Sequence, residues 1–157
     1  MLHLHLVFIG KTTFPELDAG IHRYLERLRH YVLADVHVVR AEKLTAKIHE
    51  DQVLEREADR VLRLVGKQDY VMVWDPKGQQ MESPEFAKFL KKLIEGGISE
   101  VWMILGGPLG LSDRLREQAK SVMSFSKMTF PHDLSRLIVL EQLYRAFTIL
   151  RGEPYHK

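Results

Sequence analysis

Two uninterrupted apolar runs, Tyr70 to Trp74 (YVMVW) and Val101 to Leu105 (VWMIL), most constrain how this chain can fold. Runs of this length are typical of β-strands, and a strand without polar alternation is covered by other elements on both faces. Strands of this kind belong to parallel sheets, in which a helix connects one strand to the next. The two runs therefore predict an α/β protein.

The remaining segments alternate between strand and helix patterns. Further strands are expected over residues 2–9, 35–40 and 121–125, and helices over 14–32, 54–65, 83–95, 112–120 and 133–150. This order predicts a mostly parallel sheet with helices on both faces. With 157 residues and no repeat or linker, a single domain spanning 1–157 is expected. Ligands of such sheets bind at the carboxyl ends of strands, so the loops after Trp74, Leu105 and Phe125 are the candidate site.

Composition excludes several classes of site. The chain contains no cysteine, so it has no disulfide, thiolate metal site or cysteine nucleophile. The N-terminal MLHLHLVFIG lacks a basic region and is too short to cross a bilayer, so a cytoplasmic protein without a membrane segment is expected. His3 and His5 share one face of the first strand, but no H-E-x-x-H or comparable spacing occurs. No metal site is therefore predicted.

The excess of positive charge is local. The chain has 23 Lys and Arg against 21 Asp and Glu, and residues 125–157 alone hold five against three. The remainder of the chain is balanced. A local cationic patch favours a phosphate-bearing partner, although a solvated helix face with a charged tail would give the same counts.

Individual motifs remain ambiguous when each is taken alone. Gly106, Gly107 and Gly110 allow the backbone to approach a ligand, but their spacing fits neither a dinucleotide fingerprint nor a P-loop and favours a tight strand-to-helix turn. Trp74 either packs in the core or presents an edge to a flat ligand. Arg145 either holds a phosphate or pairs with the residue four positions earlier on its helix.

Taken together, the segments LGGPLGL, SFSKMTFPHDLSRLIVLEQLYRAF and the terminal YHK resemble the ribosomal RNA large subunit methyltransferase H family, which belongs to the SPOUT superfamily of knotted methyltransferases. LVFIGK near the N-terminus and the DPKG turn fit as well, so the resemblance covers essentially the whole chain. It implies a trefoil knot in the C-terminal half, a homodimer and S-adenosylmethionine as methyl donor. It also implies a substrate, N3 of a pseudouridine in helix 69 of 23S ribosomal RNA within the 70S ribosome.

The resemblance also assigns roles to individual residues. Cofactor contacts are expected from Trp74, Gly106, Phe125, Ser126, Lys127, Met128, Thr129 and Phe130. The family often has an aliphatic residue in place of Trp74, so a backbone contact is expected to survive better there than a side-chain contact. For catalysis, His156 is expected near the N3 proton, with Tyr155 stacking on or orienting the base. The RNA backbone would be held by Arg136, Arg145 and Lys157.

Two other functions are compatible with the same features. One is a non-catalytic RNA-binding module that uses the basic tail and binds no cofactor. The other is an enzyme for a small phosphorylated metabolite, with GGPLG holding the phosphate at a helix N-terminus. The glycine turn together with SKMTFPH favours the methyltransferase over both.

Overall fold

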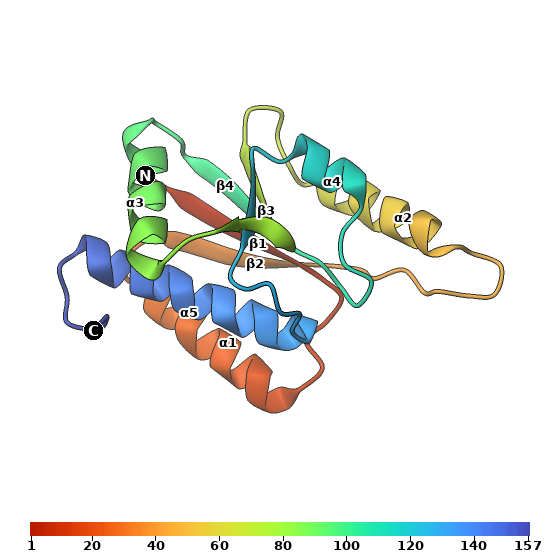
Figure 1. Cartoon of the computed structure of the whole chain (residues 1–157), viewed down its shortest axis with the longest axis horizontal. Coiled ribbons are helices and arrows are strands. Elements are labelled where there is room, and N and C mark those ends of the chain that lie inside the picture. The colour runs from red at the N-terminus through yellow and green to blue at the C-terminus, as the bar shows by residue number, and fades with distance from the viewer.

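A five-stranded sheet with the order β2-β1-β4-β3-β5 forms the centre of the protein, and all its strand pairs are parallel. The computed structural model describes every residue from Met1 to Lys157 (Figure 1). The strands are β1 (His3–Ile9), β2 (Leu33–Val39), β3 (Tyr70–Gln80), β4 (Glu100–Leu105) and β5 (Ser121–Ser124). The helices are α1 (Pro15–Leu28), α2 (Glu50–Leu62), α3 (Ser83–Glu95), α4 (Asp113–Gln118) and α5 (His132–Leu150). The predicted order of elements and the parallel sheet are confirmed.

Separate cores cover the two faces of the sheet. Helices α1, α3 and α5 pack on one face and α2 and α4 on the other, as Figure 1 shows. Along β1, Leu4, Leu6 and Phe8 enter the first core, whereas Val7 and Ile9 enter the second. This alternation follows from the two-residue period of a strand. Both faces of β1 are thus buried, as a continuous apolar strand requires.

The predicted turn at Asp75 lies inside an irregular part of β3, which corrects the expected end of that strand at Trp74. Met123 of β5 pairs with both Trp74 and Gln79, so the register shifts between those two residues. The Asp75 carboxylate accepts a hydrogen bond from the Lys77 N–H at 2.9 Å, which is the turn interaction expected of an Asp here. The chain therefore bends locally and then resumes pairing.

Helix α3 begins at Ser83, as expected. Glu82 is its N-cap, and Glu82 and Glu85 form a reciprocal capping box, so the Ser83 side chain is not needed as a cap. The Ser83 hydroxyl instead donates a hydrogen bond to Gln142 of α5 at 2.7 Å. Ser83 thus joins α3 to α5. No helix in the chain is both long enough and apolar enough to span a bilayer.

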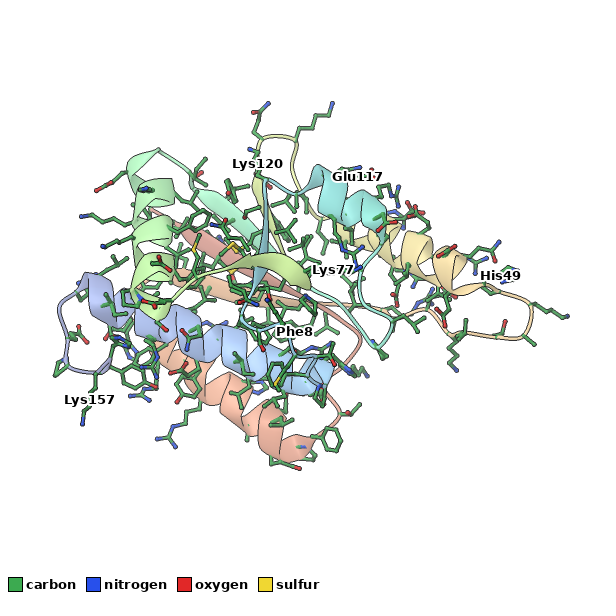
Figure 2. All side chains as sticks on the ribbon, viewed as in Figure 1. Phe8, His49, Lys77, Glu117, Lys120 and Lys157 are labelled. Atoms are coloured by element: carbon green, nitrogen blue, oxygen red, sulfur yellow. The ribbon has the colours of Figure 1, made fainter.

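Arg136 of α5 is fully buried, which contradicts the expectation that it holds the RNA backbone. Its guanidinium donates to the main-chain oxygen of Ile9 at 2.8 Å and to the Thr12 hydroxyl at 3.0 Å. The Phe8 ring lies 4.7 Å from its central carbon, near the middle of the molecule in Figure 2. Burial lowers the pKa of Arg136, although Asp133 opposes this effect. A guanidinium held in this way stabilises the fold. If it moved out to bind RNA, its partners would remain buried without a hydrogen-bond donor.

Asp133 lies one turn earlier on α5 and completes this connection. Its carboxylate accepts hydrogen bonds from the N–H groups of Thr13 at 2.8 Å and Phe14 at 3.0 Å, and its other oxygen lies 3.6 Å from Arg136 Nη1. Burial is the largest influence and acts to raise the pKa of Asp133, but the hydrogen bonds from Phe14 and Thr13 outweigh it and lower the pKa. Asp133 and Arg136, named here the α5 anchor, fasten the start of α5 to the segment between β1 and α1.

Replacing Arg136 with Ala is expected to destabilise the protein by about 3–5 kcal/mol, because Asp133 would lose its buried cation and the Ile9 oxygen its donor. Urea unfolding followed by circular dichroism measures the change. Arg23→Ala on the exposed face of α1 is the matched control and is expected to change stability by less than about 0.5 kcal/mol. Equal, small changes in both variants would show that the anchor is not a major source of stability.

Candidate functional site

A cavity of about 520 Å³ lies at the carboxyl ends of β4 and β5, beside the irregular part of β3. Its walls come mainly from the three segments 74–76, 105–111 and 124–132. These are the loops expected to form a site in a parallel sheet, and they meet around one cavity. That a ligand binds there stays a prediction. Cavities of roughly 300–1,000 Å³ suit small molecules and cofactors.

The glycine turn after β4 forms one wall. The Gly110 N–H donates to the Gly107 oxygen at 2.9 Å, and Gly110 has a φ of +83°, which favours glycine. A Cβ added at Gly106 would lie 2.6 Å from the Gly110 oxygen, so a side chain there would force the turn open. Ser112 then caps α4 by accepting a hydrogen bond from the Leu115 N–H, at the position where that helix was expected to begin. The segment is therefore a tight turn and also a cavity wall.

The loop between β5 and α5 forms the opposite wall. Of its predicted cofactor residues, Phe125, Ser126, Met128, Thr129 and Phe130 line the cavity, whereas the exposed Lys127 does not. Hydroxyl groups shape this loop. The Ser124 hydroxyl donates to the Ser126 oxygen at 2.7 Å, and the Ser126 hydroxyl accepts from the Met128 N–H at 3.0 Å. The predicted cofactor contact of Lys127 stays a prediction, and in this conformation Lys127 is exposed beside the cavity.

Trp74 both packs against the core and faces the cavity. Its ring meets Phe86 edge-on at 5.6 Å and lies 5.8 Å from the Phe125 ring. Its indole nitrogen is buried and has no hydrogen-bond partner. A buried donor without a partner is costly, so this N–H is available to an acceptor on a bound molecule. Neighbouring Asp75 is not available in this way, because Arg116 binds it at 2.8 Å.

A second cavity of about 570 Å³ adjoins the first. The two share lining residues on β3 and on the loop after β5, including Trp74, Phe125 and Phe130. The second cavity extends to Gln142 of α5 and to His156 in the C-terminal tail. The predicted catalytic histidine therefore lies beside the predicted cofactor residues, although it is far from them in the sequence.

The C-terminal tail is fastened to α1 and α5. The Tyr155 hydroxyl donates to Glu141 at 3.0 Å and lies 3.3 Å from the Tyr24 hydroxyl. Burial and these hydrogen bonds raise the pKa of Tyr155 far above its usual value. Tyr31 donates to Glu153, which raises the pKa of Tyr31 to about 12. Tyr155 lines neither cavity, so in this conformation it anchors the tail and is not placed to stack on a substrate base.

Arg145 connects this anchored tail to His156. It pairs with Glu141 at 2.5 Å, as the four-residue spacing allowed, and this hydrogen bond raises the pKa of Arg145. Its Nη1 also lies 3.1 Å from His156 Nδ1. A guanidinium only donates hydrogen bonds, so Nδ1 is the acceptor and the ring proton of His156 is on Nε2. Lys157 follows at the end of the tail and extends away from the protein (Figure 2).

His132 was not predicted as a site residue, yet it lines the first cavity at the start of α5. Burial lowers the pKa of His132, with a further contribution from the nearby Arg136 charge. Its imidazole is therefore neutral near pH 7. The only signal in the sequence was its position directly after the predicted cofactor loop, next to Pro131.

Comparisons with known proteins agree with this architecture. A family profile described as "Predicted SPOUT methyltransferase" matches residues 2–156. A protein of Syntrophobacter fumaroxidans named ribosomal RNA large subunit methyltransferase H is 55% identical, and the match covers 99% of this chain and 100% of that protein. The chain belongs to the ribosomal RNA large subunit methyltransferase H family of SPOUT methyltransferases. The resemblance found in the sequence is thereby confirmed.

Other members of the methyltransferase H family are more distant. A protein of the same name from Desulfitobacterium hafniense (strain DSM 10664 / DCB-2) is 39% identical over 100% of both chains. Among solved structures, a probable methylase family protein from Haemophilus influenzae Rd KW20 matches with a TM-score of 0.52 at 12% identity, covering 99% of this chain and 70% of that one. This last likeness concerns the fold alone. The trefoil knot and the homodimer stay predictions.

Replacing Tyr155 with Phe is expected to loosen the tail, because the hydroxyl that reaches Glu141 and Tyr24 is removed while the ring remains. A loss of about 0.5–1.5 kcal/mol is expected for one such hydrogen bond, seen as faster amide hydrogen exchange in residues 151–157. Tyr70→Phe is the control, since no side-chain hydrogen bond of its hydroxyl occurs in the structure. Unchanged exchange in Tyr155→Phe would mean that ring packing alone holds the tail.

Proposed function

We propose that this protein transfers a methyl group from S-adenosylmethionine to N3 of a pseudouridine in helix 69 of 23S ribosomal RNA, within the assembled 70S ribosome. The observation that carries the proposal is the cavity between the glycine turn and the loop after β5, with His156 in the adjoining cavity. Membership of the methyltransferase H family supports the reaction and the RNA. The finer choice of base and of ribosomal particle rests on the family resemblance.

The residues of the cavity fit S-adenosylmethionine. The rings of Phe125 and Phe130 supply apolar surface for a flat purine, and the Trp74 indole N–H offers an unused donor. The turn at Gly106 brings bare backbone to the opposite wall. When bound, the cofactor supplies a methyl group already activated on a sulfonium. The protein is left to bind it, to align it with N3 and to help N3 lose its proton.

His156 is proposed to act as a hydrogen-bond donor. With Nδ1 occupied by Arg145, its Nε2–H is the group free to meet the substrate. As N3 loses its proton, negative charge develops on the carbonyl oxygens of the base, and a positioned N–H stabilises that charge. The proton itself goes to another acceptor, such as water. This role differs from that of a general base, for which the ring would have to leave Arg145 or exchange its tautomer.

Recognition of RNA is proposed to rest on the exposed cations beside the site. Lys127 lies on the loop that lines the cavity, and Arg151 and Lys157 are exposed at the end of α5 and in the tail. Arg136 takes no part because it is buried. A net charge of +2 suits recognition of a preassembled RNA surface better than binding to any nucleic acid. We also propose a cytoplasmic homodimer with the trefoil knot of the family.

The reaction is tested with labelled S-adenosylmethionine and unmethylated 70S ribosomes, with 50S subunits and free ribosomal RNA alongside. Label is expected in helix 69 of the 70S particle and at much lower levels in the other two. Binding of ribosomes without binding of the cofactor would support the RNA-binding module instead. Methylation of small phosphorylated molecules in the absence of RNA would favour the metabolite enzyme.

The role of His156 is tested with Ala and Gln variants. His156→Ala is expected to lower kcat by about 10²–10³ with nearly unchanged affinity for S-adenosylmethionine, because a donor to the developing charge is lost. His156→Gln keeps an N–H donor but has no basic nitrogen, so it should retain much more activity. The exposed His22→Ala is the control. Equal loss in the Ala and Gln variants would instead identify His156 as a base.

Replacing Gly106 with Ala is expected to weaken S-adenosylmethionine binding at least about tenfold, because the added Cβ would lie 2.6 Å from the Gly110 oxygen and displace the cavity wall. Isothermal titration calorimetry gives the affinity. Gly97→Ala is the control, since it strains the backbone at a positive φ of +79° but follows α3, outside the residues that line either cavity. Equal affinity in wild type and Gly106→Ala would place the cofactor elsewhere.

A further inference from the structure

We propose that His3, His5 and Glu100 form a binding site for a divalent transition metal, with Zn²⁺ as the best-suited ion. The site lies at the amino ends of β1 and β4, on the opposite edge of the sheet from the methyl-transfer cavity. The spacing of the histidines predicted no metal site. That prediction could not include Glu100, which is distant in sequence and becomes a neighbour only when β1 and β4 pair.

The strand register brings the three side chains together. His3 and His5 point to the same face of β1, since side chains alternate along a strand. His3 pairs with Glu100 across the parallel β1–β4 ladder. His5 Nε2 lies 2.6 Å from Glu100 Oε2, and His3 Nδ1 lies 3.8 Å from the same oxygen. All three donor atoms lie within 4.8 Å of one another.

Each histidine also has a partner on its other ring nitrogen. His3 Nε2 lies 2.7 Å from Asp35 Oδ2, and His5 Nδ1 lies 3.0 Å from His37 Nε2. Metal-bound histidines almost always use their second nitrogen in this way, which fixes the orientation of the ring. Trp102 stacks on His5 at 4.0 Å with an interplanar angle of 11°. Two rings are therefore already held with one nitrogen each directed toward Glu100.

Small movements would complete the coordination. Ligand atoms of a tetrahedral zinc ion lie about 3.3 Å apart when each is roughly 2.0–2.2 Å from the metal. The contact of 2.6 Å would open and the contact of 3.8 Å would close, and both involve the carboxylate of Glu100. The third separation, between the ligand nitrogens of His3 and His5, is at most 4.8 Å, and it closes as the His3 ring, whose side chain is 25% exposed, turns toward His5. That side chain is 42% exposed, so it can move, while the His5 side chain is only 10% exposed and stays in place.

The donor set indicates the class of metal. Two imidazoles and one carboxylate, with a fourth position open to water, are a common set for zinc. Ca²⁺ and Mg²⁺ prefer oxygen ligands, so they are poorly matched to this site. Metal bound here would join β1 directly to β4 and, through Asp35 and His37, would also orient β2. Binding should therefore stabilise the folded chain and leave methyl transfer unchanged.

The test uses the full-length protein, freed of any affinity tag, and ZnCl₂ in competition with a chromophoric chelator. Wild type is expected to bind one Zn²⁺ per chain and to gain thermal stability as zinc is added. The double variant His3→Gln/His5→Gln is expected to bind at least about 100-fold more weakly, since removal of an outer partner alone typically costs 10–100-fold. Glu100→Gln changes an exposed side chain, so it tests the site even if the double variant fails to fold.

The matched control is His22→Gln/His30→Gln, which removes two exposed histidines away from the sheet and should bind zinc as wild type does. Methyl transfer by the His3→Gln/His5→Gln variant should equal that of wild type, which separates this site from the proposed reaction. The proposal is overturned if wild type shows no saturable binding below about 1 mM. It is also overturned if the control pair loses as much affinity as the His3/His5 pair, or if Glu100→Gln and the His3/His5 variant both bind as wild type does.

Discussion

The rest of the structure depends on the buried contact of Arg136 and Asp133 with the segment after β1. Arg136 donates to the Ile9 oxygen, and Asp133 accepts from the N–H groups of Thr13 and Phe14. One Asp133 oxygen and two Arg136 nitrogens are hydrogen-bonded to the end of β1 and the segment after it, whereas Asp133 Oδ1 and Arg136 Nε are buried without a hydrogen-bond partner. Moving the start of α5 would leave further buried polar groups unpaired, so it has little freedom to shift. The loop over residues 125–131 is held between β5 and this α5 anchor. The cavity exists because that loop is fixed opposite the glycine turn.

The carboxyl and amino edges of the sheet carry different chemistry. At the carboxyl edge, glycine and hydroxyl residues leave backbone and aromatic surface exposed to a ligand, and His156 comes from the tail to complete the site. Arg145 and Tyr155 both bind Glu141, so one carboxylate orients the guanidinium that in turn sets the tautomer of His156. At the amino edge, the side chains of three strands meet as histidines and carboxylates. The sheet separates the two groups, so each is expected to function without the other.

Local patterns in the sequence predicted the fold well because they reflect short-range physics. The runs YVMVW and VWMIL are buried strands, and the helix expected from residue 112 begins after Ser112, its N-cap, since strand formation and capping depend on residues close in sequence. Arg136 was misjudged because its partners are 124 and 127 residues away, and no local pattern distinguishes a buried arginine from an exposed one. The proximity of Glu100 to His3 and His5 was not predicted for the same reason, since His5 and Glu100 are 95 residues apart in the sequence. The positions of Lys127 and Tyr155 depended on loop and tail conformation, which side-chain type alone does not determine.

The central claim is that the methyl donor binds between the glycine turn and the loop after β5. Amide hydrogen exchange measured by mass spectrometry, with and without saturating S-adenosylmethionine, tests this claim most directly. We expect slower exchange in peptides that cover residues 105–111 and 124–132, with no change in peptides from α2. Protection confined to other parts of the chain, or the absence of protection at a concentration that saturates binding, would contradict the account.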